Sequence, residues 1–204
     1  MQRGTLLVTA FAMLSLTGAS GAHANTVSFK LLRSNGLAST CAPHATATVK
    51  VATQPGADNF AEKMTITVDG LAGETALDAF VIQVPNAPFG LSWYEGDLET
   101  DGSGHVSRTF VGRFNEETFA VAPGSVHAPT PHGSADAGTN PKFAPVHTFH
   151  VGLWFNSPAD ATHNGCPATV TPFNGEHTAG VQVLSSRNAG NTNDLTGPLK
   201  KVHD

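Results

Sequence analysis

The chain has 204 residues, of which 40% are hydrophobic and 13% are charged, and its formal net charge at pH 7 is −5. This length supplies apolar material for one globular domain, or at most two small ones. Charged residues are about half as frequent as in an average globular domain, and their balance is acidic. The composition therefore excludes a dedicated binder of nucleic acid or of anionic membranes.

The first 24 residues have the layout of a secretory signal peptide. Arg3 precedes an apolar run over residues 5–17, and the small residues at positions 22 and 24 favour cleavage after Ala24. The apolar run is shorter than the roughly 20 residues that a membrane-spanning helix needs. No later segment approaches that length, so we expect a secreted or extracytoplasmic protein with no membrane span after cleavage.

The two cysteines, Cys41 and Cys166, both lie in the expected mature chain. In an oxidising compartment a single pair of cysteines is most simply a disulfide, and we predict that these two are joined. The alternative is a catalytic thiol activated by His44 or His163, each three residues from a cysteine, but it leaves the second cysteine without a role.

The mature chain has the pattern of an all-β domain. Residues 45–51 and 64–69 alternate small or apolar side chains with polar ones, as strands with one buried face do. Residues 80–84 and 149–155 have apolar side chains at both parities, which indicates central strands covered on two sides. Further strands are expected at 27–31, 93–99, 105–111, 117–121 and 181–183. The spacing predicts one antiparallel β-sandwich, immunoglobulin-like or related, over residues 25–184.

Two local structures follow from turn and cap residues. Residues 101–104 favour a hairpin turn in which Asp97 faces Arg108 across the strand pair. The acidic spacing from Asp97 to Asp101 also resembles the opening of a calcium loop, although Arg108 stands where a bidentate glutamate is needed. A short helix is expected at residues 158–164, with Ser157 as its N-cap and Gly165 after its end.

Three segments, Phe80–Tyr94, Gly152–Ala161 and Thr171–His177, resemble a group of uncharacterised secreted bacterial proteins, for which no activity is known. The segment from Phe155 to Gln182 also has a faint similarity to the closing strands of chordin-type extracellular β domains, but it lacks their His-Ile-His and Gly-Glu-Ile-Arg-Gly patterns. The resemblance implies a β fold and transfers no catalytic residue.

Histidines carry the hint of a transition-metal site. His147 and His177 share parity with apolar residues of two expected strands, so they could meet if those strands are neighbours. A zinc or copper site built from His147, His177 and Glu176 would then be chemically reasonable. The motif is nonspecific, and histidines that are buried with hydrogen-bond partners or that face solvent explain the same pattern.

Catalytic templates are missing from the sequence. There is no nucleophile elbow, zinc-protease helix, phosphate-binding loop or dinucleotide fingerprint. A glycosidase pair among Glu95, Glu99, Glu116, Glu117 and Glu176 would require a carboxyl separation that sequence does not supply.

Two segments lie outside the expected strands and helix. Residues 122–145 form an unusually long connection that, with the apolar stretch 88–94, suits contact with a ligand or partner. Polar residues 185–204 are predicted to be a flexible tail. We therefore expect a noncatalytic extracellular binding or structural module, the alternative being a metal-dependent secreted enzyme. The candidate ligand contacts are Phe89, Trp93, Tyr94, His127 and His132.

Overall fold

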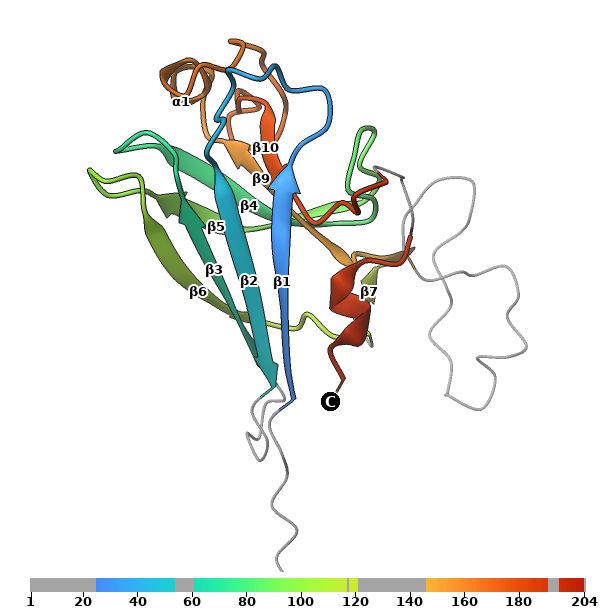
Figure 1. Ribbon diagram of the computed structural model, residues 1–204. Helices are drawn as coiled ribbons and strands as arrows, with labels where there is room; N and C mark the ends of the chain where they lie inside the picture. The colour runs from blue at the N-terminus through green and yellow to red at the C-terminus, as the bar shows by residue number, and fades with distance from the viewer. Residues whose placement is uncertain (1–24, 54–60, 117, 121–145, 191–194, 204) are drawn as a thin grey trace, which may run out of the picture.

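The computed structural model describes residues 25–53, 61–116, 118–120, 146–190 and 195–203 (Figure 1). The expected signal peptide, His127 and His132 lie outside these residues. The strands are β1 (Thr26–Arg33), β2 (Thr46–Thr53), β3 (Glu62–Asp69), β4 (Ala76–Ile82), β5 (Ser92–Glu99), β6 (Val106–Gly112), β7 (Phe119–Ala120), β8 (Val146–His147), β9 (His150–Phe155) and β10 (Gln182–Ser185). Two short helices, α1 (Pro158–His163) and the 3-10 helix η2 (Pro198–Lys201), complete the described elements.

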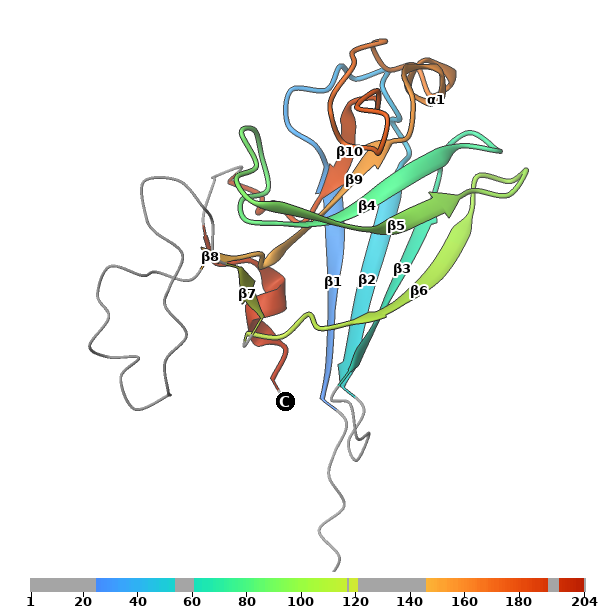
Figure 2. The ribbon, with the colours of Figure 1, turned by 180° about the vertical axis from the view of Figure 1, so that it is seen from behind.

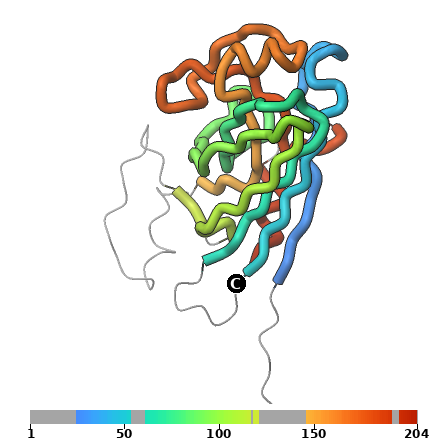
Figure 3. The backbone as a smooth tube through the Cα atoms, turned by 90° about the vertical axis from the view of Figure 1, so that its left-hand side faces the viewer, coloured from blue at the N-terminus to red at the C-terminus, as the bar shows by residue number. Residues whose placement is uncertain are grey.

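Eight strands form one antiparallel sheet in the order β5-β4-β9-β10-β1-β2-β3-β6, and β7 pairs with β8. The sheet has two halves of four strands, because β1 and β10 are joined by only two register pairs, at Leu32 and Arg33. Figure 3 shows β1, β2, β3 and β6 as one curved layer, and the halves enclose a common core. The end strands β5 and β6 approach each other, so the sheet is nearly closed into a barrel (Figure 2).

The predicted all-β antiparallel fold is confirmed, but the two separate sheets of an immunoglobulin-like sandwich are not. The predicted pairing of residues 93–99 with 105–111 is also not formed, since β5 pairs with β4 and β6 pairs with β3. Arg108 lies opposite Ile66 in the register. Its guanidinium nevertheless reaches across the gap and donates to the backbone carbonyl of Asp97.

The two halves of the sheet differ in how their strands are buried. On β2, the alternate residues Ala47, Val49 and Val51 are buried and their neighbours face solvent. On β9, by contrast, every residue is buried, and on β4 all but the first are. This half must therefore be covered on its outer face as well as on its inner face.

Helix α1 begins and ends as its sequence predicts. Ser157 Oγ accepts a hydrogen bond from the backbone N–H of Asp160 at 3.1 Å, and Pro158 occupies the first turn. Gly165, just past the helix, has a positive φ of 71° and lies against Thr40, where a side chain would collide with a carbonyl. The helix carries the chain directly from β9 to Cys166.

The predicted disulfide between Cys41 and Cys166 is present, and both cysteines are buried. None of the helices among the described residues is long and apolar enough to cross a membrane. The disulfide fits an extracytoplasmic protein, because disulfides form and persist in oxidising compartments.

The C-terminal segment differs from its prediction as a flexible tail. Leu199 and Val202 are each 1% exposed and belong to the core, and η2 lies beside β1 (Figure 1). The backbone N–H of Leu199 also donates to the carbonyl of Phe149. Leu199 and Val202 thus anchor the C-terminal segment in the core, although the composition of that segment is polar.

Replacing Cys41 and Cys166 together by alanine should lower the free energy of unfolding by about 2–5 kcal/mol, because the bridge restricts a long loop of the unfolded chain. Chemical denaturation of the oxidised protein and of the double variant would measure the difference. Wild-type protein kept under reductant serves as the control and should unfold like the variant. Equal midpoints for oxidised wild type and variant would contradict a stabilising role.

Candidate functional site

The outer face of β4 and β9 is covered by a second, aromatic cluster. Phe80, Ile82 and Trp154 are buried there, and Phe89 and Phe173 pack on them from two loops. The rings of Trp154 and Phe173 are stacked, with centroids 4.1 Å apart and planes 9° apart. Phe89 meets Trp154 edge to face at 4.9 Å.

Residues 171–180, the covering loop, are fastened to the barrel by hydrogen bonds. Thr171 and Ala179 form a β-bridge, and the Thr171 hydroxyl donates to the carbonyl of Gly180. The side-chain amide of Asn174 donates to the carbonyl of Asn156 at 2.8 Å, and its oxygen accepts from the N–H of Thr178. These bonds hold the loop over the outer face of β4.

Beside the aromatic cluster lies a cavity of about 710 Å³, which we call the acidic pocket. Its floor and one wall come from β4 and β5, and the opposite wall comes from the covering loop. Four carboxylates and two aromatic rings are prominent in its lining: Asp78, Asp97, Glu99, Glu176, Phe80 and Tyr94. Among the described residues that line it there is no lysine, arginine or histidine.

Asp78 is the most unusual of these carboxylates. It lies on the central strand β4, directly opposite Asp97 of β5, and is only 1% exposed. Burial, and then the hydrogen bond and negative charge of Asp97, raise the pKa of Asp78 to about 7. One of its carboxylate oxygens, Oδ2, has no hydrogen-bond partner. A buried carboxylate oxygen without a donor is costly, which makes it a feature that calls for a functional explanation.

Tyr94 closes the side of the pocket next to this pair. Its hydroxyl donates to Asp97 Oδ1 at 2.5 Å, and its ring meets Phe80 edge to face at 5.6 Å. Burial and the hydrogen bond to Asp97 raise the pKa of the phenol, so it stays protonated and keeps donating. Asp97 thus receives a proton donor from Tyr94, whereas Asp78 Oδ2 receives none.

A further carboxylate, Asp160 of α1, adds negative charge near Asp78 but has its own partners. Its Oδ2 accepts from the hydroxyl of Ser157 at 2.5 Å, and its Oδ1 accepts from the N–H of Ala76 at 3.1 Å. Asp160 therefore links α1 to the start of β4.

The ligand-contact residues predicted from the stretch 88–94 are divided among three surroundings. Phe89 belongs to the aromatic cluster, and Tyr94 lines the acidic pocket. Trp93 points to the other side of β5, where it is 67% exposed. Successive residues of a strand face opposite ways, which explains why the neighbours Trp93 and Tyr94 separate.

The structure does not bring His147 and His177 together. β9 and β10 are neighbours, as the metal hypothesis requires, but they run antiparallel with Gln182 opposite Trp154. Residue 147 precedes β9 and residue 177 precedes β10, so they lie at opposite ends of the strand pair. His147 instead pairs with Phe119 in the small sheet and stacks on Phe149 at 4.6 Å.

Glu176 lines the acidic pocket, and His177 follows it in a tight turn with a φ of 58°. Within the part of the chain that the structure describes, no group of three His, Cys, Asp or Glu side chains could hold a metal ion. The zinc or copper site therefore has no support from the strand arrangement.

The acidic residues that resemble a calcium loop have a structural role instead. Asp101 accepts hydrogen bonds from Ser103 and His105, and these bonds stabilise the turn at residues 101–104.

The five glutamates considered for a glycosidase pair lie in different surroundings, and Glu117 is outside the described residues. Asp78 and Asp97 are within hydrogen-bonding distance of each other, whereas a glycosidic bond must fit between carboxyl groups about 5 Å or more apart. Glu95 faces a different cavity from Glu99 and Glu176, and Glu116 binds His203 at 2.8 Å.

Sequence reasoning missed Asp78. The signal was available: Asp78 lies two residues before the predicted strand 80–84, between the apolar residues Leu77 and Ala79, and shares the parity of Phe80 once the strand begins earlier, as β4 does. A charged residue at such a position must be buried with a partner or serve a function.

Comparison of the chain with known protein families, with curated proteins and with solved structures finds no match. A functional assignment therefore rests on the geometry of the described residues.

Replacing Asp78 by asparagine should make the protein's stability less dependent on pH. Because the folded pKa, about 7, lies above the ordinary value of 3.8, the fold favours the protonated carboxyl. Its contribution is fully present below about pH 4 and is lost as the pH rises through about 7. The D78N variant should thus gain stability relative to wild type between those pH values, by up to about 4 kcal/mol.

Urea denaturation at several pH values would measure this difference. The Asp97→Asn variant is a second test: it removes a hydrogen bond and a negative charge that raise the pKa of Asp78, so the loss of stability with rising pH should begin at a lower pH than in wild type. A constant difference between D78N and wild type across the range would contradict a raised pKa.

Proposed function

We propose that the protein is a noncatalytic binding module of an extracytoplasmic compartment and that its acidic pocket binds a small polar ligand carrying positive charge. The observation that supports this proposal is the buried carboxylate of Asp78, whose Oδ2 lacks a donor at the base of a cavity. An ammonium or guanidinium group supplies the missing donor and charge together.

The charge of the pocket supports a cationic ligand over a neutral or anionic one. Asp78, Asp97, Glu99 and Glu176 line a concave site in which field lines are concentrated. Arg108 lies near Asp97, but its guanidinium is engaged with a backbone carbonyl. A carboxylate or phosphate ligand would meet repulsion with no cation in the described lining to offset it.

The shape supports a ligand of limited size with an apolar part. A cavity of about 710 Å³ is within the range of small-molecule sites. Phe80 and Tyr94 supply apolar lining, and the side chain of Asn156 adds a polar group to it. We place the ligand's positive group at Asp78 and its remainder along these side chains.

The proposed compartment rests on two features of different kinds. The disulfide between Cys41 and Cys166 fits an oxidising environment. The signal-peptide pattern of residues 1–24 supplies the export route.

Isothermal titration calorimetry with agmatine and 1,4-diaminobutane would test the ligand class. At about pH 8, where Asp78 is ionised, both should bind, and D78N should weaken binding by about tenfold or more because a buried ion pair is lost. Binding should also weaken toward pH 5.5, at which Asp78 carries a proton. Succinate and erythritol, matched in length but anionic and neutral, should not bind.

Glu74→Gln is the matched control, since it removes one negative charge from an exposed residue outside the pocket lining. It should leave the affinity for agmatine unchanged. Equal affinities in wild type, D78N and E74Q, or no binding of either amine, would overturn the proposal.

A further inference from the structure

A second cavity lies where the barrel does not close. Near the turn, Arg108 of β6 bridges to the backbone of β5 at Asp97. Toward the other end of the two strands is a cavity of about 420 Å³, which we call the seam pocket. No strand pairs with the facing edges of β5 and β6 within the described chain.

The seam pocket gathers exposed apolar side chains. Trp93 is 67% exposed, Val111 is 65% exposed and Phe119 is 53% exposed, and all three line this cavity. Val81 and Leu91 add apolar lining from β4 and from the loop before β5. Large apolar side chains gathered at one concave place mark a binding site more strongly than the same residues scattered over a surface.

One carboxylate, Glu95, is set into this apolar lining. The register of β4 and β5 passes from Ala79 opposite Gly96 to Phe80 opposite Tyr94, so Glu95 is the extra residue of a β-bulge. Glu95 lies two residues after Trp93 and lines the seam pocket with it, whereas Tyr94 between them lines the acidic pocket. Burial alone raises the pKa of Glu95 to about 7.

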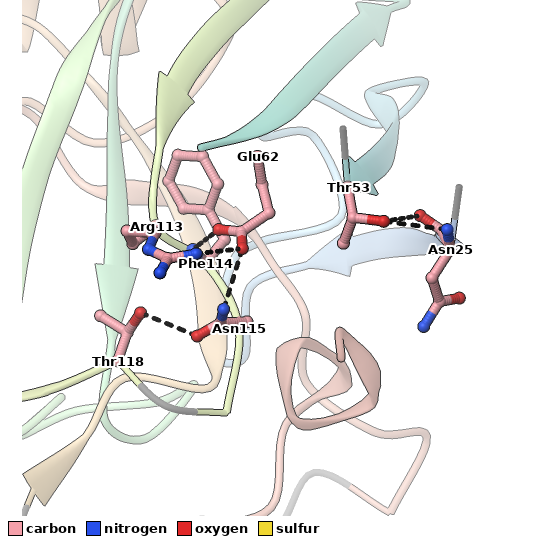
Figure 4. Close-up of polar contacts among 7 residues, drawn as sticks. All are labelled: Asn25, Thr53, Glu62, Arg113, Phe114, Asn115 and Thr118. Atoms are coloured by element: carbon pink, nitrogen blue, oxygen red, sulfur yellow. Dashed lines mark hydrogen bonds and ion pairs between the residues drawn. The ribbon is translucent and has the colours of Figure 1, made fainter. Parts of the chain in front are cut away.

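The other charged residue in the seam-pocket lining, Arg113, is engaged elsewhere. Its guanidinium contacts Glu62 Oε1 at 3.3 Å, and Glu62 also accepts hydrogen bonds from the backbone N–H of Phe114 at 2.6 Å and from the side chain of Asn115 at 2.9 Å (Figure 4). Glu62 is 1% exposed, so this network is part of the folded core. Arg113 therefore has Glu62 as a partner, and an amine bound in the seam pocket would bring a further positive charge beside Glu95.

We propose that the seam pocket is a second ligand site, distinct from the acidic pocket, and that it binds a hydrophobic amine. The ammonium group pairs with Glu95, and the hydrocarbon part lies against Trp93, Val111 and Phe119. Two effects favour such a ligand. The ammonium group neutralises the charge of Glu95, and the hydrocarbon chain covers the exposed apolar surface.

The chemistry distinguishes this ligand from other amphiphiles. A fatty acid would place a second carboxylate beside Glu95 and would be repelled at pH values above the pKa of that residue. A neutral alcohol of the same length gains the apolar contacts but not the ion pair. Binding of the amine should strengthen as the pH rises through about 7, since Glu95 then ionises while Arg113 and the amine stay charged.

Fluorescence and calorimetry with n-octylammonium chloride would test the site. Trp154 is fully buried, so a blue shift of the emission on binding reports on exposed Trp93, and the Trp93→Phe variant should lose it. At about pH 8 the wild type should bind octylammonium about tenfold more tightly than the Glu95→Gln variant. Octanol should bind wild type and E95Q equally and weakly, and octanoate should not bind wild type.

The outcome is separable from that of the acidic pocket. The D78N variant should bind octylammonium as wild type does, and E95Q should bind agmatine as wild type does. Equal binding of octylammonium to wild type and E95Q, or a loss of binding in D78N instead, would overturn the seam-pocket proposal. Absence of any octylammonium binding would overturn it as well.

Discussion

The stack of Phe173 on Trp154 holds the covering loop against the outer face of the sheet, and the acidic pocket depends on it. In the half formed by β10, β9, β4 and β5 the strands are covered on both faces, as the burial of every residue of β9 shows. One face is covered by the opposite half of the barrel. The other is covered by Phe173, by Phe89 and by the loops that carry them. Without this layer Trp154 and Phe80 would be exposed to water, at a cost on the order of 2 kcal/mol for each large side chain.

The same layer accounts for the properties of Asp78. Its strand position gives it the outward parity that Phe80 and Ile82 share, so all three lie on the face beneath the covering layer. Burying a carboxylate beside Asp97 is unfavourable when both are charged, and one proton near neutral pH relieves the conflict. A cation bound in the acidic pocket would therefore relieve the repulsion between Asp78 and Asp97, as the proton does. On the other side of β5, Glu95 at the β-bulge is likewise a carboxylate whose ionisation is opposed by its surroundings, here by apolar side chains alone.

Local features were the most predictable from sequence. Ser157, Pro158 and Gly165 specify the ends of α1 through short-range capping, and a chain with two cysteines has only one possible internal disulfide. The strands were predicted from alternation, as at residues 45–51, and from apolar side chains at both parities, as at 149–155. These signals depend on neighbours in the chain, and the structure confirms them.

The order of the strands and the site were harder to predict, since they depend on contacts between distant segments. The turn at 101–104 favours a hairpin between β5 and β6, yet β5 pairs with β4 and β6 with β3, so the two strands become the opposite ends of one sheet. Parity suggested that His147 and His177 could meet, but parity fixes the face of a strand and not the end at which a residue lies. Asp78 and Asp97 become partners only through the β4–β5 register, which no local pattern specifies.

The ionisation of Asp78 links the covering layer to the acidic pocket, and carbon-13 NMR of side-chain carboxyl groups measures it directly. A titration of the wild-type protein, with the Asp78 resonance assigned by its absence in D78N, should give a midpoint near 7, because the covering layer and Asp97 both oppose ionisation. A midpoint near the ordinary value of 3.8 would show that Asp78 is solvated. That result would contradict both the closed outer face and the acidic pocket that depends on it.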